Sequence, residues 1–250
     1  MEKKEQQQSK FGLIGRNINY SFSKTYFTKK FGNLSLQDYY YDNFHLDAIS
    51  ELPNLLRDNR GLKGLNVTIP YKEEVIKYLD RLDEEASKIG AVNTIRFTPS
   101  GLKGYNTDAF GFRESLLPHL KSEHQKALIL GTGGASKAIA YVLGKLNITY
   151  TFVSRNPTKD QLAYTDLTKE VIEANKLCIN CTPLGTHPNI LDKPSLPYEY
   201  YGKEHLLYDL IYNPSKTAFL LEGEKRGATI INGLSMLELQ AEKSWEIWNL

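Results

Sequence analysis

The chain has 250 residues, a length that suits two domains of ordinary size, each able to bury its own core. Its 31 Lys and Arg nearly balance 29 Asp and Glu, and a net charge of +2 is too small to indicate a nucleic-acid or acidic membrane surface, so a small molecule is the expected partner. No stretch approaches the roughly eighteen apolar residues of a membrane span, and the charged, Gln-rich segment 1–10 lacks the apolar core of a signal peptide, so we expect a cytoplasmic protein with a frayed amino-terminal tail.

In the first half of the chain, short strand patterns alternate with helix patterns. Strands are predicted at residues 11–14, 39–43 and 65–69, and the helices that follow them at residues 24–31, 46–58 and 72–79. Two further strands, 91–97 and 102–105, are joined by a Pro- and Gly-containing turn and indicate a hairpin. The alternation predicts β-α-β units and a mainly parallel sheet. A helix at 107–120 then leads to the second half.

The second half shows the same alternation of strand and helix patterns and predicts a doubly wound, nucleotide-binding lobe. Its strands are predicted at residues 127–130, 149–153, 177–180, 206–211 and 229–231. The segment 156–167 is short and contains Pro157, so one crossover helix is expected to be missing or reduced. A terminal helix, 235–250, offers Leu237, Gln240 and Trp245 for packing back on the first lobe.

A glycine-rich turn lies past the middle of the chain, directly after the apolar run 127–130. The turn reads Gly131-Thr132-Gly133-Gly134 and opens the next helix, as a dinucleotide phosphate loop does. The glycines allow a tight turn and close backbone approach, and the helix amides hold the pyrophosphate charge. A plain strand-to-helix turn is the alternative, but the flanking strand and the following β-α units favour the nucleotide loop.

The end of the second strand of this lobe bears on the choice of cofactor. An NAD site usually carries an acidic residue there for the ribose hydroxyls, but this chain reads Val153-Ser154-Arg155-Asn156. Because a guanidinium suits a 2′-phosphate, Arg155 favours NADP over NAD. The alternative is a solvated surface arginine.

Three polar clusters precede the glycine loop, at residues 12–23, 64–72 and 104–108. The clusters at 64–72 and 104–108 lie at the carboxyl ends of predicted strands, where open α/β sheets bind ligands, and the cluster at 12–23 lies beside a helix start. Lys72 stands at the start of a predicted helix, where a cation opposes the macrodipole, so it suggests function or a snorkelling surface lysine. Ser21 and Ser23 present two hydroxyls that suit a carboxylate, or they simply cap the helix that follows.

Three other groups of residues carry weaker signals. Cys178 and Cys181 form a C-x-x-C, but there is no second ligand pair and no thioredoxin-like context, so small core and loop residues are favoured over metal or redox chemistry. The five histidines lack ligand spacing, are read as surface or loop residues, and no metal site is expected. Tyr39–Tyr41 is interpreted as strand packing, because no basic stripe accompanies it.

With these clusters in order, the chain resembles the shikimate dehydrogenase family along nearly its whole length. The motifs that carry the resemblance are Asn66–Lys72, Gly90–Thr94, Asn106–Asp108, the glycine loop, Asn180–Gly185, Tyr212–Pro214 with Thr217 and Leu220, and Gly233–Gln240. The resemblance implies reversible reduction of 3-dehydroshikimate to shikimate with NADP(H), on the pathway to chorismate and aromatic amino acids. It also implies an α/β fold in which residues 1–106 and 234–250 form a substrate-binding catalytic domain and residues 107–233 a Rossmann-like NADP-binding domain.

The resemblance also assigns roles by matching motif. Lys72 and Asp108 correspond to the catalytic pair, Ser21 and Ser23 to ligands of the substrate carboxylate. Residues that correspond to ligands of the ring hydroxyls are Asn66, Thr68, Asn93, Asp108 and Gln240, with Tyr212 nearby. The expected cofactor ligands are Gly131, Thr132, Gly133, Gly134 and Ala135 at the pyrophosphate, Ser154, Arg155, Asn156 and Lys159 at the 2′-phosphate, and Thr182, Pro183, Leu184, Gly233 and Met236 at the nicotinamide.

The chain departs from the family pattern at three places. Tyr20 and Lys24 stand where the family has His and Pro around the serines, Ser154 begins the 2′-phosphate segment in place of Asn, and Thr186 replaces a methionine. Two alternatives therefore stay open: a dual quinate and shikimate dehydrogenase that also uses NAD, and a nucleotide-binding relative without activity. Whether Lys72 donates the proton or only stabilises charge is also open, as is the choice between monomer and homodimer.

Overall fold

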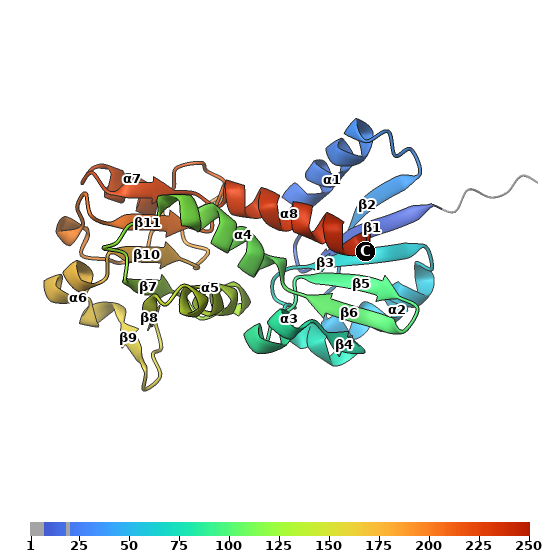
Figure 1. Cartoon of the computed structure of the whole chain (residues 1–250), viewed down its shortest axis with the longest axis horizontal. Coiled ribbons are helices and arrows are strands. Elements are labelled where there is room, and N and C mark those ends of the chain that lie inside the picture. Colours follow the sequence, from blue (N-terminus) through green and yellow to red (C-terminus); the bar gives the residue numbers. More distant parts are fainter. Residues whose placement is uncertain (1–7, 19–20) are drawn as a thin grey trace, which may run out of the picture. The chain divides into compact units, whose positions relative to one another are not determined.

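The computed structural model describes residues 8–18 and 21–250, which divide into two compact units (Figure 1). The first unit contains the described residues up to Thr107 together with Ala241–Leu250, and the second unit contains Asp108–Gln240. Helix α8 (Leu234–Trp248) therefore contributes its beginning to the second unit and its end to the first. Residues 1–7 of the expected frayed tail 1–10 and the departure at Tyr20 lie outside the described residues. Ser9 and Lys10, at the end of that tail, are not frayed but belong to strand β1 (Ser9–Gly15).

The sheet of the first unit has six strands and mixed direction. Its spatial order is β2 (Tyr39–His45), β1 (Ser9–Gly15), β3 (Leu62–Val67), β5 (Thr94–Thr98), β6 (Gly101–Tyr105) and β4 (Arg81–Leu82). Strand β1 pairs in parallel with β2 and β3, whereas β5 runs antiparallel to β3 and β6. The predicted α/β class and the β5–β6 hairpin are confirmed, and the short strand β4 was not predicted.

The first helix of this unit is longer than the predicted 24–31, whereas the predicted helices 46–58 and 72–79 are replaced by shorter elements. The helices of the unit are α1 (Phe22–Asn33), η1 (Ile49–Glu51), α2 (Leu52–Asp58), η2 (Glu74–Tyr78) and α3 (Glu84–Ile89). The predicted helix beginning at Lys72 is wrong: this residue lies in a turn before the short 3-10 helix η2. The helix-dipole argument for Lys72 fails with it, because a turn carries no aligned amides for the ammonium to oppose.

Aromatic side chains hold the end of α8 against this sheet. The Trp248 ring centroid lies 4.8 Å from that of Phe11 and 5.2 Å from that of Phe27, and the Trp248 indole nitrogen donates to the Ile95 carbonyl at 3.0 Å. Trp245 meets Phe11 edge-on at 5.9 Å, which confirms the expected packing of this residue on the first lobe. Such aromatic pairs contribute roughly 0.5–1.5 kcal/mol each beyond their buried area.

The second unit contains a six-stranded sheet in which all strands are parallel. Its order is β12 (Thr229–Ile231), β11 (Leu206–Asp209), β10 (Leu177–Asn180), β7 (Lys126–Leu130), β8 (Thr149–Ser154) and β9 (Gln161–Ala163). The predicted doubly wound lobe is confirmed. The strand order reverses between β7 and β10, and the carboxyl ends of those two strands are where such sheets bind ligands.

Two connections of this sheet, both within the described residues, contain no α-helix: the one between β8 and β9, and the one between β10 and β11, which contains only a short 3-10 helix. The helices are α4 (Thr107–Leu116), η3 (Leu117–His119), α5 (Gly134–Lys145), η4 (Tyr164–Asp166), α6 (Lys169–Ala174), η5 (Tyr198–Tyr200) and α7 (Ala218–Glu224). Between β8 and β9 the chain runs through Pro157 in an irregular loop, as expected for a reduced crossover. None of the helices in the described ranges has the length and apolarity needed to cross a membrane.

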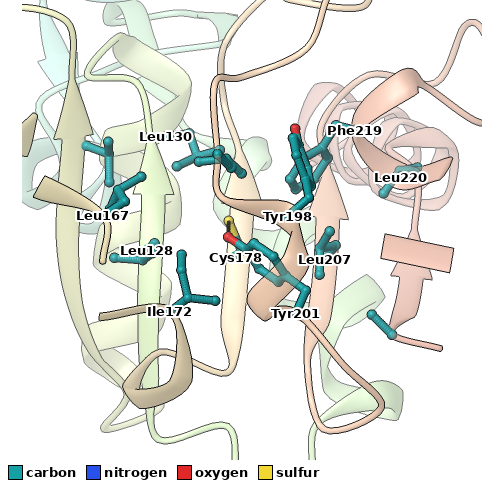
Figure 2. Packing of buried hydrophobic residues seen from close by; sticks show 13 residues of the cluster. Leu128, Leu130, Leu167, Ile172, Cys178, Tyr198, Tyr201, Leu207, Phe219 and Leu220 are labelled. Atoms are coloured by element: carbon teal, nitrogen blue, oxygen red, sulfur yellow. Dashed lines mark hydrogen bonds between the residues drawn. The ribbon is translucent and has the colours of Figure 1, made fainter. Parts of the chain in front are cut away.

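The core on one side of this sheet is apolar and includes the first cysteine. Leu128, Cys178 and Leu207 come from three neighbouring strands and are fully buried, and Tyr198 and Tyr201 cover them from the segment around η5 (Figure 2). The continuous apolar runs that predicted these strands are explained by this burial on both faces of a parallel sheet.

Candidate functional site

In the first unit, the two candidate serines lie at the start of α1. Ser21 occupies the N-cap position, but its side chain makes no capping hydrogen bond, so the capping interpretation is wrong for this residue. The Ser21 hydroxyl oxygen is buried and has no hydrogen-bond partner among the described residues. A buried hydroxyl without a partner costs free energy, which is unusual in a position with a purely structural role. Lys24, at the departure from the family pattern, forms an exposed ion pair with Asp42 at 3.1 Å.

Tyr41 connects the second serine with the first candidate asparagine. The Ser23 hydroxyl is hydrogen-bonded to the Tyr41 hydroxyl, which in turn donates to Asn66 Oδ1 at 2.8 Å. Burial raises the pKa of Tyr41 far above its usual value, so the phenol stays protonated and remains a donor. The interpretation of this tyrosine as strand packing was therefore incomplete, because its ring is buried while its hydroxyl orients a candidate substrate ligand.

The amides of Asn66 and Asn93 are held by a cluster of three buried hydroxyls. Asn66 Nδ2 lies 3.0 Å from Ser244 Oγ and 3.2 Å from Thr94 Oγ1, and the backbone amide of Thr107 donates to Asn93 Oδ1 at 2.7 Å. The three hydroxyl oxygens lie 2.8 to 3.3 Å from one another. A fully satisfied network of this kind fixes the rotamer of every member. Sequence reasoning missed Ser244, which is far from Asn66 along the chain.

Thr68 and Lys72 lie in the loop that follows β3, and their backbone is fixed at both ends. The Thr68 amide donates to the Ile14 carbonyl at 2.9 Å, and the Val92 amide donates to the Lys72 carbonyl at 2.7 Å. Lys72 itself is only partly buried. The lysine side chain therefore extends from a fixed backbone next to the strand ends that carry Asn66 and Asn93.

In the second unit, the glycine loop connects β7 with α5 as predicted. Gly131 has φ 101°, and its amide donates to the Val153 carbonyl at 2.9 Å. A Cβ at this position would lie 3.3 Å from Thr182 Cγ2 and 3.5 Å from the Cys181 carbonyl, so the glycine loop closely approaches the turn after β10. Gly133 is the N-cap of α5, and both Thr132 and Gly133 are exposed. The first turn of α5, whose amides have no acceptor within the helix, therefore begins at the switch point of the sheet.

The candidate 2′-phosphate residues lie beside this loop, at the end of β8. Leu130 and Val153 are partners in the parallel pairing of β7 and β8, which brings the segment after Val153 next to the glycine loop. Ser154 Oγ accepts the Asn156 amide at 3.2 Å and fixes a small turn. Arg155 and Lys159 are exposed, and no carboxylate of the described residues forms an ion pair with either. The two cations are therefore available to an anionic group.

The turn after β10 holds the candidate residues of the nicotinamide side. Asn180 Oδ1 accepts from the amide of Thr182 at 3.0 Å and from its hydroxyl at 2.7 Å. Thr182 Oγ1 then accepts the Leu184 amide at 3.3 Å. These bonds fix the turn through the exposed Pro183. Thr186, at the third departure from the family pattern, is also exposed, and its amide donates to the Pro183 carbonyl at 3.1 Å.

Asp108 and Gln240 come from two helices of the second unit that approach each other closely. Asp108 lies in the first turn of α4, where the helix dipole favours a carboxylate. Gly111, one turn further on, packs against α8 so tightly that a Cβ there would lie 2.5 Å from the Met236 carbonyl and 3.1 Å from the Gln240 amide. The aspartate and the glutamine therefore occupy neighbouring positions.

Tyr212 and Gly233 follow the last two strands of this sheet. The Gly233 amide donates to the Ile211 carbonyl at 3.0 Å, which joins the start of α8 to the segment after β11. Tyr212 is half-buried in that segment, and desolvation raises its pKa above the ordinary value, so its phenol is neutral at physiological pH.

The cysteines and histidines do not form a reactive or metal-binding group. Cys178 and Cys181 are not joined in a disulfide, and burial raises the pKa of Cys178 to about 12 and that of Cys181 well above its usual value. Protonated thiols are poor nucleophiles and poor metal ligands. The described part of the chain contains no group of three or more His, Cys, Asp or Glu side chains arranged for a metal ion. His124 and His205 lie in loops, as expected for the histidines, although their side chains are buried.

The second unit is a doubly wound parallel sheet with an exposed glycine loop, and the first is an α/β unit with a buried polar cluster and a lysine. Together these features define a two-domain enzyme of the dinucleotide-dependent type. The family model described as the shikimate dehydrogenase substrate binding domain matches residues 13–95. The shikimate dehydrogenase (NADP(+)) of Clostridium botulinum strain Hall is 39% identical over 96% of both chains. The chain belongs to the shikimate dehydrogenase family.

Solved structures agree with this assignment. Shikimate dehydrogenase 1 from Peptoclostridium difficile has a TM-score of 0.83 and 38% sequence identity, and the match covers 97% of this chain and 92% of that one. The Thermus thermophilus enzyme, solved in complex with NADP(H) and shikimate, has a TM-score of 0.85 and 30% identity, and the match covers 96% of this chain and 93% of that one. The similarity therefore extends over both units.

Proposed function

We propose that this chain is an NADP-dependent shikimate dehydrogenase that catalyses the reversible reduction of 3-dehydroshikimate to shikimate. The observation that carries the proposal is the 39% identity to a relative of that name over 96% of both chains, because it includes the substrate unit and the nucleotide unit together. In this proposal residues 1–106 and 234–250 bind and orient the substrate, and residues 107–233 bind NADP(H).

Ser21 and Ser23 hold the substrate carboxylate in this proposal. The buried Ser21 hydroxyl without a partner supports the assignment, since a carboxylate oxygen would satisfy it. Ser23 already contacts Tyr41, and through it Asn66, so the carboxylate site and the hydroxyl site share one network. Ligands of the ring hydroxyls are then Asn66, Thr68, Asn93, Asp108 and Gln240, with Tyr212 nearby.

The residues of the second unit fit the phosphates of NADP(H). Exposed amides at the start of α5 suit the pyrophosphate, and the exposed cations Arg155 and Lys159 suit the 2′-phosphate. Thr182, Pro183, Leu184, Gly233 and Met236 form the nicotinamide side. When bound, NADPH supplies the hydride for the ketone carbon.

Lys72 and Asp108 form the catalytic pair of this proposal. Reduction of a ketone places negative charge on the carbonyl oxygen, which an ammonium group stabilises and protonates. The fixed Lys72 backbone supports a defined position for that ammonium. Asp108, in the first turn of α4, orients the ammonium and the reacting hydroxyl.

A spectrophotometric assay tests the function directly. The assay follows the absorbance of the reduced cofactor, NADPH or NADH, as shikimate or quinate is oxidised with NADP or NAD. The highest kcat/KM should be that for shikimate with NADP. Tight NADPH binding without any oxidation on addition of 3-dehydroshikimate would instead identify an inactive relative. A higher kcat/KM with quinate or NAD would establish the dual-substrate alternative.

The role of Lys72 has its own test. Lys72→Ala should lower kcat roughly a hundredfold or more while the KM for shikimate changes only a few-fold. Lys77→Ala, which removes an exposed lysine of η2, is the matched control and should leave both constants unchanged. Near-normal turnover of the Lys72 variant contradicts the assigned role without affecting the proposed reaction.

The setting of the enzyme completes the proposal. We propose that the enzyme works in the cytoplasm, as a monomer or homodimer and without a nucleic-acid or membrane partner. Cell fractionation and light scattering on the purified chain test these two points.

A further inference from the structure

We propose that Asp209 is a positioning residue for the turn on the nicotinamide side: its buried carboxylate sets the orientation of the Asn180 amide, and Asn180 in turn sets the conformation of residues 182–184. The inference rests on the proposed function, because that function gives this turn its ligand. It adds a residue that touches neither substrate nor cofactor.

The two side chains are neighbours because of the strand register. Asn180 is the last residue of β10 and Asp209 is the last residue of β11, and they are partners in the parallel pairing of these strands. Asn180 Nδ2 donates to Asp209 Oδ1 at 3.0 Å, and both residues are fully buried. The contact therefore belongs to the sheet itself and does not depend on a flexible loop.

The carboxylate determines which way the Asn180 amide points. Its Nδ2 faces Asp209, so its Oδ1 faces the turn, where it accepts from the amide of Thr182 at 3.0 Å and from its hydroxyl at 2.7 Å. Rotating the amide by half a turn would place an oxygen against the carboxylate and an NH₂ group against the Thr182 amide. The negative charge thus excludes the reversed amide, and with it a different turn.

Asp209 is itself fixed by two donors besides Asn180. The Ile211 amide donates to Oδ1 at 3.0 Å, and the Thr217 hydroxyl donates to Oδ2 at 2.6 Å. Thr217 is also the N-cap of α7 and accepts the Leu220 amide. The carboxylate is therefore held from β10, from the segment after β11 and from α7, and it has no freedom to rotate away from Asn180.

A purely structural residue at this place would not need a charge. The neighbouring strand β7 ends in Leu130, the register partner of Asn180, and this leucine is fully buried in the core (Figure 2). Burying a carboxylate instead costs free energy, and desolvation raises the pKa of Asp209 to about 6 despite its three donors. Because a leucine fills the corresponding position of the neighbouring strand, packing alone does not require a polar residue here. The Asn180–Asp209 pair is explained instead by the turn that it orients.

The experiment compares two ligands that differ only in the nicotinamide. Affinities of Asp209→Asn and Asn180→Ala for NADP and for 2′-phospho-ADP-ribose, which lacks the nicotinamide, are measured by calorimetry. We expect NADP to bind about fivefold more weakly to both variants, because one hydrogen bond at the turn is lost. The affinity for 2′-phospho-ADP-ribose should change less than about twofold. The second ligand should be insensitive because it lacks the nicotinamide, the only part of NADP that the proposed function assigns to the turn at residues 182–184.

Tyr208→Phe is the matched control. It removes a buried hydroxyl, hydrogen-bonded to Ser115 at 2.6 Å, from the residue before Asp209 on the same strand. Its loss should lower stability but leave the ratio of the two affinities unchanged. Equal weakening of both ligands in Asp209→Asn, or no weakening of NADP, would overturn the proposal.

Two further measurements cover the cases in which Asp209→Asn does not fold or the wild type has no activity. If Asp209→Asn does not fold, Asn180→Ala decides, because it cuts the same connection while leaving the carboxylate its other two donors. Wild-type turnover of 3-dehydroshikimate is measured first. Its absence refutes the proposed function, whereas an active wild type with unselective variants refutes only the role of Asp209.

Discussion

Alanine at Gly131 should destabilise the second unit, whereas alanine at Gly133, two residues away in the same loop, should not. Gly131 has φ 101°, outside the range that L-residues adopt readily, which costs roughly 1–3 kcal/mol. An added Cβ would also lie 3.3 Å from Thr182 Cγ2, a tight contact. Gly133 has φ −80° and ψ −179°, and a Cβ there would meet no atom within 4 Å. Alanine is a poorer N-cap than glycine but loses less backbone entropy on folding, and these effects offset to within about 0.5 kcal/mol.

Thermal unfolding without cofactor separates the two variants. At roughly 3 °C per kcal/mol, Gly131→Ala should lower Tm by roughly 3–9 °C and Gly133→Ala by less than about 2 °C. The affinity for NADP should show a different pattern, since a methyl group on the exposed Gly133 obstructs the approach of the pyrophosphate while leaving the fold intact. Equal losses of Tm, or a larger loss at Gly133, would contradict the loop geometry described above.

Two further predictions concern buried polar groups. Tyr41→Phe removes the donor to Asn66 Oδ1 and should raise the KM for 3-dehydroshikimate about fivefold with the NADP affinity unchanged; equal effects on both ligands would point to general destabilisation. His205 accepts the Gly202 amide on Nδ1 at 3.0 Å, and burial lowers its pKa below the unfolded value of 6.5, so its contribution to stability is complete above that pH and is lost as pH falls through the folded pKa. The acid side of a chemical-denaturation pH profile should therefore be shallower in His205→Asn, and an unchanged slope would exclude this group as its source.

The strands of the nucleotide unit could be predicted almost completely from sequence because they carry apolar runs, which are buried in the central strands β7 and β10. Runs such as Leu177–Asn180 and Thr229–Ile231 were predicted with the bounds that the structure has. The exception is β9, whose three residues Gln161–Ala163 are only partly buried and carry no apolar run. Its existence depends on pairing with β8, which a local pattern does not contain.

The substrate unit was harder to predict because its helices are short. Helix α3 has a clear signal at each end, since Asp83 caps it through the Glu85 amide at 3.0 Å and Gly90 ends it in the left-handed conformation. These two residues would have located the helix. For Lys72 no such signal exists: the apolar spacing around Val75 fits an α-helix and a 3-10 helix equally well, and only the structure distinguishes them.

Sequence motifs located the candidate ligands but not the residues that orient them. Asn66, Asn93 and Asn180 all lie at strand ends, yet their amides are occupied largely by protein partners such as Tyr41 and Asp209, which come from other strands. A local motif contains only one side of such a long-range pair, so partners like Ser244 and Asp209 carry no signal of their own. These positions become visible once the register of the strands is known.

The division between occupied and unoccupied polar groups has a consequence for binding. Ser21 and Arg155 have no hydrogen-bond or ion-pair partner among the described residues, so a ligand can gain their full interaction without breaking a bond inside the protein. Asn180, in contrast, has its amide groups engaged, and its contribution is a fixed turn that costs no reorganisation when the ligand arrives. Changes at the first kind of residue should therefore weaken one ligand group directly, whereas changes at the second kind should act through the conformation of a neighbouring backbone segment.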